Sequence, residues 1–152
     1  MNQNNSYYWL CSYPLEGGSI ISPGNWGRII SLYAFDTNNL NQIRERVFEK
    51  VRTENYPDRP SRLKSTYLCK DIDGARQFLR DTNRRFDLIY EVEVLEQGKP
   101  LFTTDWKRAD HVDGESESLM IIRAHNYWKA EDVAHPEVLT ESRIKIVRRI
   151  EI

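Results

Sequence analysis

The sequence predicts a mixed α+β domain. Segments whose apolar residues recur three and four positions apart, typical of helices, are mixed irregularly with short segments whose apolar residues recur every second position, typical of strands. A doubly wound fold would show regular strand–helix alternation, which this chain lacks. At 152 residues, 39% of them hydrophobic, the chain suits one domain over 1–152, and polar residues 1–6 are expected to be frayed.

Apolar periodicity and the positions of Pro, Gly and capping residues divide the chain into short elements. No internal repeat or low-complexity linker separates them. In order, the sequence predicts strands at 7–12 and 19–21, a loop at 22–37, a helix at 38–55, a strand at 63–69, a helix at 72–83, strands at 88–95 and 100–104, a loop at 105–114, a helix at 115–128 and strands at 138–139 and 144–152.

The first strands and the first helix are predicted from their side chains. Tyr7–Ser12 is aromatic and apolar, and the short strand at Ile20-Ile21 lies between turn residues. The loop at 22–37 is expected to become ordered only when a ligand binds. The first helix has a candidate N-cap among residues 37–39, and one apolar stripe predicts its buried face. That stripe consists of Leu40, Ile43, Val47 and Val51.

The later elements follow from capping and alternation. The strand at 63–69 leads into a helix that Asp71 caps. Residues 88–95 alternate apolar and charged side chains, as expected of a strand with one buried face, and the C-terminal strand alternates in the same way. The third helix is expected to turn Leu119 and Ile122 toward the core.

Composition excludes several classes of function. Lys and Arg total 22 against 23 Asp and Glu, and this net charge of −1 excludes a generic basic nucleic-acid binder while permitting local basic patches. No apolar run approaches the roughly 20 residues of a membrane span, and the polar N-terminus does not predict a signal peptide. With two cysteines, Cys11 and Cys69, and three histidines without ligand spacing, neither a disulfide scaffold nor a metal site is expected. These features predict a soluble cytoplasmic protein.

The most informative pattern lies in residues 61–78. A strand ends near the aromatic Tyr67, a capped turn follows, and a helix presents the small Ala75 to the sheet, while Pro136-Glu137 opens a late strand. This arrangement resembles the ADP-ribosyltransferase superfamily, in which a strand-one motif, a strand-two Tyr or Ser-Thr-Ser and a late-strand glutamate surround nicotinamide adenine dinucleotide (NAD). Residues 49–63 further resemble a bacterial and phage branch, catalogued as a domain of unknown function, that includes an mRNA-modifying toxin of a phage-defence toxin–antitoxin–chaperone system.

The resemblance implies a fold, a co-substrate and a set of site residues. The fold would be a split β-sandwich of two small sheets flanked by helices, and NAD would bind without a metal. Glu137 would stabilise the positive charge that develops on the ribose as the nicotinamide leaves, and Tyr67 would stack on the nicotinamide. The other candidate contacts are Trp9, Leu10, Cys11, Trp26, Arg28, Arg62 and Ser65 for NAD, and His135 and Trp128 for the acceptor.

Five of the candidates also have an explanation in ordinary packing or solvation. Glu137 could simply open an edge strand, Tyr67 could be a core tyrosine, and Trp26 could be a surface staple. Arg62 could pair with a carboxylate of the first helix, and Arg28, in a glycine-flanked loop, could be solvated.

The chain departs from the superfamily pattern at two places. Strand one lacks the usual Arg or His, and Trp9 or Leu10 stands there, so backbone groups of Leu10 and Cys11 would have to hold the nicotinamide amide. His135 stands two residues before Glu137, where arginine-specific transferases carry another Glu, which weighs against arginine-directed modification of proteins.

The expected function is therefore mono-ADP-ribosylation of a macromolecule, with RNA (mRNA) favoured as acceptor and an antitoxin protein as partner. Basic clusters at 59–64, 84–85 and 143–149 could contact phosphates, or could form a solvated charged face. Two alternatives stay open. The acceptor could be a protein or water, and the domain could be a non-enzymatic module that binds a partner.

Overall fold

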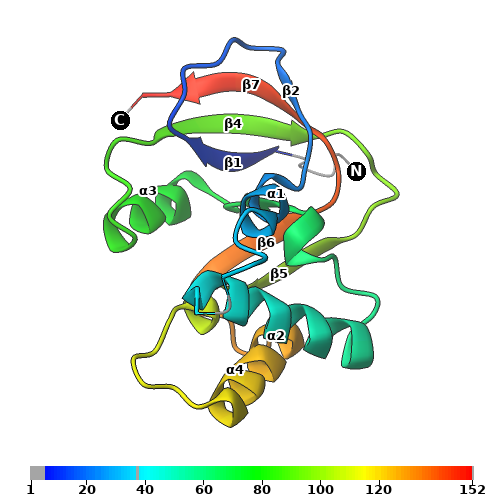
Figure 1. Ribbon diagram of the computed structural model, residues 1–152. Coiled ribbons are helices and arrows are strands. Elements are labelled where there is room, and N and C mark those ends of the chain that lie inside the picture. Colours follow the sequence, from blue (N-terminus) through cyan, green and yellow to red (C-terminus); the bar gives the residue numbers. More distant parts are fainter. Residues whose placement is uncertain (1–5, 37, 152) are drawn as a thin grey trace.

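The computed structural model describes residues 6–36 and 38–151, so residues 1–5 of the segment predicted to be frayed, the candidate cap Thr37 and the last residue of the predicted C-terminal strand lie outside the described residues. The prediction of fraying is wrong at Ser6, which begins the first strand and pairs with Glu93. Within the described residues the chain forms two antiparallel sheets and four α-helices, which confirms the predicted α+β class and its two small sheets flanked by helices. In Figure 1 one sheet lies above the other, and α2 and α4 lie beneath the lower sheet.

The upper sheet has the order β1-β4-β7-β2. Its strands are Ser6–Cys11 (β1), Leu88–Val94 (β4), Ile144–Ile150 (β7) and Ile20–Ile21 (β2). Leu10 pairs with Ile89, and Cys11 pairs with Leu88. The predicted half-buried character of β4 is confirmed, because Val92 and Val94 are buried while the intervening Glu93 is exposed.

The lower sheet has the order β3-β6-β5, formed by Thr66–Leu68 (β3), Pro136–Thr140 (β6) and Leu101–Asp105 (β5). Helices α2 (Leu40–Asn55) and α4 (Glu117–Lys129) share its core. Asn39 caps α2 by accepting a hydrogen bond from the Gln42 backbone N–H, as one of the predicted caps should. The buried side chains at the centre of this core are Phe48, Tyr127, Trp128 and Leu139.

The two sheets meet where β1 passes β3. The backbone groups of Tyr8 and Cys69 exchange hydrogen bonds of 3.0 and 2.7 Å, which join the two strands. Helix α3 (Ile72–Asp81), capped by Asp71 as predicted, packs its buried Ala75 against the cluster that contains Leu10. At this junction, β1 of the upper sheet and β3 of the lower sheet border a common space.

Three short segments differ from the prediction. The expected loop at 22–37 contains helix α1 (Asn25–Ser31). A 3-10 turn, η1 (Arg62–Lys64), replaces the start of the expected strand at 63–69, and a second, η2 (Trp106–Ala109), lies in the expected loop after β5. Elements of three to seven residues are too short to show a helical period, so their sequences carried no signal.

The predicted inward face of α4 is wrong. Leu119 and Ile122 are 56% and 55% exposed, and Leu40, expected in the α2 stripe, is 59% exposed. Helix α4 carries apolar residues on both faces, so spacing alone cannot identify the buried one. Its buried residues are Met120, Ala124, Tyr127 and Trp128. None of the helices in the described part of the chain is long and apolar enough to cross a membrane.

Candidate functional site

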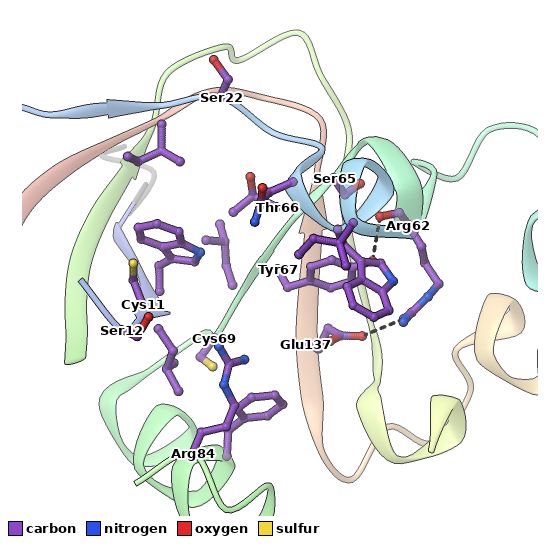
Figure 2. Close-up of a pocket in the computed structure, with 18 of the residues that line it drawn as sticks. Cys11, Ser12, Ser22, Arg62, Ser65, Thr66, Tyr67, Cys69, Arg84 and Glu137 are labelled. Carbon is purple, nitrogen blue, oxygen red and sulfur yellow. Dashed lines mark hydrogen bonds and ion pairs between the residues drawn. The ribbon is translucent and has the colours of Figure 1, made fainter. Parts of the chain in front are cut away.

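A cleft of about 840 Å³ opens at the junction of the two sheets, bounded by β1, β3, α1 and the start of β6 (Figure 2). Its volume lies within the range usual for small-molecule and cofactor sites. Most of the site residues predicted from sequence line this one space. They are Trp9, Leu10, Cys11, Trp26, Arg62, Ser65, Tyr67 and Glu137.

Glu137 is a buried carboxylate at the edge of the cleft. It lies on β6, its Oε2 accepts a hydrogen bond of 2.8 Å from the Tyr127 hydroxyl, and the same oxygen is 3.6 Å from Nη1 of Arg62. Among the described residues, Oε1 has no hydrogen-bond partner, which leaves it available to a ligand. Burial raises the pKa of Glu137 above its ordinary value, and the Arg62 charge and the Tyr127 hydrogen bond offset this only in part.

Arg62 is held by Glu45 of helix α2. Its Nε and Nη2 lie 3.0 and 2.9 Å from the Glu45 carboxylate oxygens, and its Nη1 donates to the Tyr127 hydroxyl at 2.7 Å. Glu45 is 1% exposed and also accepts hydrogen bonds from Arg44 and from the Trp26 indole N–H, at 3.0 and 2.9 Å. The pairing of Arg62 with a carboxylate of the first long helix, one of the two explanations open from sequence, is therefore confirmed.

Tyr67 forms an uncharged wall of the cleft. Its hydroxyl donates a hydrogen bond of 2.7 Å to the backbone carbonyl of Arg62, and its ring centroid lies 5.2 Å from the Arg62 guanidinium. Burial raises the pKa of the Tyr67 hydroxyl, so the group stays protonated. The ring can thus offer a flat apolar surface to a planar ligand.

Helix α1 brings Trp26 over the cleft because glycines allow a close approach. Gly24 precedes the helix with φ +97°, a left-handed conformation that favours glycine. A Cβ at Gly27 would collide with the backbone carbonyl of Leu63 in η1, so only glycine lets the helix lie this close. Trp26, which the sequence leaves open as an NAD contact or a surface staple, is anchored by its hydrogen bond to Glu45 while it lines the cleft.

Three predicted contacts do not reach the cleft. Arg28 is exposed and is not part of the cleft lining, and its guanidinium hydrogen-bonds the side chain of Asn25 on the same helix. Trp128 is 0% exposed and donates its indole N–H to the Phe48 carbonyl, so it is a core residue. His135 packs edge-on against Trp106 and is absent from the cleft lining, although it is close to Glu137 in sequence.

The sequence does not single out Glu45 or Tyr127, and it places Arg84 only in a basic cluster that could contact nucleic-acid phosphates. Glu45 and Tyr127 reach the site from α2 and α4, and nothing local in the sequence distinguishes them from other helix residues. Arg84 lines the cleft from the loop between α3 and β4. Within 6–36 and 38–151, no group of three or more His, Cys, Asp and Glu side chains is placed to hold a metal ion.

A family model, described as a protein of unknown function (DUF2441), matches residues 23–152. The chain belongs to the DUF2441 family. No curated protein matches the chain. The DUF2441 match includes Arg62, Tyr67 and Glu137, whereas the β1 wall of the cleft precedes it. The description of the family names no activity.

The carboxyl of Glu137 in this DUF2441 protein is expected to titrate above the ordinary glutamate pKa, and Tyr127→Phe is expected to raise the pKa further. Burial is the main cause of the upward shift, and Tyr127→Phe removes one of the three interactions that oppose it, the others being the charges of Arg62 and Arg44. Carbon-13 NMR titration of the side-chain carboxyls, with Glu137→Gln for assignment, measures both values. Tyr56→Phe is the matched control, because the Tyr56 hydroxyl contacts His125. A lower pKa in Tyr127→Phe would contradict the assignment.

Proposed function

We propose that the protein is an NAD-dependent mono-ADP-ribosyltransferase that modifies RNA and acts as a toxin controlled by an antitoxin protein. The observation that carries the proposal is the convergence of Glu137, Tyr67 and strand β1 on one cleft. The identity of the dinucleotide and the preference for RNA come from the sequence resemblance.

The residues of the cleft fit a nucleotide ligand in two respects. Ser65 lines the cleft and is 2% exposed, and its buried hydroxyl has no hydrogen-bond partner among the described residues. Buried hydroxyls normally have partners, so this atom is suited to bind a polar group of a ligand. Trp9, Trp26 and Tyr67 supply aromatic surface for flat rings.

Strand β1 supplies backbone groups at the same place. Tyr8 directs its N–H and C=O toward Cys69 of the β3 side. Leu10 lies two residues further along the strand, so its N–H and C=O point to the same side of β1 as those of Tyr8. They lie beyond the Tyr8–Cys69 bridge on that side. They can hold the carboxamide of nicotinamide, which needs one donor and one acceptor.

Glu137 would supply the electrostatic part of catalysis. When bound, the dinucleotide supplies a ribose carbon whose bond to nicotinamide can be broken in favour of an acceptor. Ionised Glu137 would accept a hydrogen bond from a ribose hydroxyl and stabilise the positive charge that develops on the sugar. Arg62 and Tyr127 orient that carboxylate by contacting its Oε2, while Oε1 stays available.

The nature of the acceptor is tested by a transfer assay. Purified protein is incubated with adenylate-labelled NAD in three separate reactions, which contain RNA, DNA or a pool of proteins. Label is expected in the RNA pool alone. Label in the protein pool or only in free ADP-ribose would support the alternative acceptors. A wild-type protein that shows no heat of binding at millimolar NAD would favour the non-enzymatic module and overturn the proposal.

A further inference from the structure

Two of the three arginines that line the cleft are already neutralised. Arg44 and Arg62 both bind Glu45, and Arg44 also donates to the backbone carbonyl of Ala109 at 2.9 Å. With Glu137 3.6 Å from Arg62, this group contains two positive and two negative side chains. It therefore offers little net charge to an anionic ligand.

Arg84 differs from these arginines in its exposure and in its unused donors. Its side chain is 47% exposed, and its Nη2 pairs with Asp87 at 2.7 Å. Its Nε and Nη1 have no hydrogen-bond partner within the described part of the chain. A planar guanidinium can bind one anion along one edge and keep donors for a second anion on another.

The fold directs Arg84 into the cleft at the end of β1. Cys11 of β1 pairs with Leu88, so the loop that carries Arg84 approaches the cleft beside the residues proposed to hold nicotinamide. The guanidinium lies 5.9 Å from the ring of Phe78, another residue of the lining. Figure 2 shows Arg84 extending into the cleft near Cys69, apart from Arg62 and Glu137.

We propose that Arg84 binds the diphosphate of the dinucleotide and supplies the cation that strand β1 lacks. This inference rests on the proposed function, because it assumes a dinucleotide in the cleft. A diphosphate requires positive charge and several donors in one place, and Arg84 is the cleft arginine that combines an accessible guanidinium with free donors. The contact with Asp87 is an ion pair at Nη2, and it leaves Nε and Nη1 of Arg84 unused.

The inference is tested by calorimetric titration with NAD and with ADP-ribose. Arg84→Gln is expected to weaken binding of both by about 10- to 100-fold, since a charge-assisted contact to the diphosphate is lost. Because one charged contact is lost, the remaining binding should also be less sensitive to potassium chloride. Arg28→Gln is the matched control, because Arg28 is an exposed arginine outside the cleft that binds a neighbouring side chain.

A second variant separates binding from folding. Arg84→Gln leaves the buried Asp87 carboxylate without its cation, so the double variant Arg84→Gln with Asp87→Asn is titrated beside it. The same loss of affinity is expected in both. If wild-type protein binds neither ligand, the proposed function fails together with this inference. If both variants bind NAD and ADP-ribose as tightly as wild-type protein does, the assignment of Arg84 to the diphosphate is overturned. The same conclusion follows if the variants lose only transfer to RNA.

Discussion

Glu137→Gln is expected to lower the rate of ADP-ribose transfer by at least about 100-fold, the usual effect of removing a group that stabilises charge in a transition state. Glutamine keeps the shape of the side chain and can still accept the Tyr127 hydrogen bond, but it carries no negative charge. Single-turnover transfer from labelled NAD measures the effect. Glu141→Gln, at the residue that follows β6, is the matched control with wild-type activity expected.

The thermal stability of Glu137→Gln distinguishes catalysis from a structural role. The raised pKa of Glu137 means that its ionised form is disfavoured in the folded protein. The stability associated with this group is present below the ordinary glutamate pKa and is lost as the pH rises through the raised value. At neutral pH, the uncharged variant should therefore melt at the same temperature as wild type or higher. Full activity in a folded Glu137→Gln protein would contradict the catalytic assignment.

The parts of the fold that were predictable have local causes. Strand β4 was identified because alternation of apolar and charged residues is a local property, and α2 began where an asparagine cap preceded a spaced apolar pattern. The prediction of the inward face of α4 is wrong because Leu119 and Ile122 are as apolar as the helix residues that are buried in the core. Which face is buried depends on the packing of the helix against β5 and α2, and the sequence of the helix does not contain that information.

The residues of the site likewise divide into those with a local sequence signal and those without one. Tyr67 and Glu137 could be named because their motifs are local, and the structure places both on the cleft. Glu45 and Tyr127 could not, since each meets Arg62 across 17 and 65 positions of sequence. Arg62 was identified as a cleft residue, but only the position of Glu45 shows that its charge is already neutralised. A cation for a phosphate group would therefore have to come from another residue.

The charged cluster around Glu45 suggests the largest effect on stability. Glu45→Gln is expected to lower the free energy of unfolding by about 3–5 kcal/mol, the usual cost of removing one partner from a buried ion pair. Arg44 and Arg62 would remain in the interior with their closest counter-charge gone, and the Trp26 indole would lose its charged acceptor. Because Trp26, Arg44 and Arg62 come from α1, α2 and η1, the loss should loosen the contact among all three elements.

Glu49→Gln provides the matched control on the same helix. Glu49 binds Arg52 but is more exposed, so its loss should cost about 1 kcal/mol or less. Urea denaturation monitored by circular dichroism measures both variants. Burial alone would raise the pKa of Glu45, but the nearby charges and hydrogen bonds of Arg62 and Arg44 hold it below its ordinary value. Its stabilisation is therefore present at neutral pH and lost as the pH falls through that lowered pKa.

The pH dependence gives Glu45→Gln a signature that simple loss of packing would not produce. The difference in stability between wild type and Glu45→Gln should be constant above the ordinary glutamate pKa and should narrow in acid, where wild-type Glu45 becomes neutral like its replacement. The gap for Glu49→Gln should stay small throughout. If Glu45→Gln is as stable as Glu49→Gln at neutral pH, the carboxylate does not hold α1, α2 and η1 together. The position of Arg62, which lies 3.6 Å from Glu137, would then need a cause other than its ion pair with Glu45.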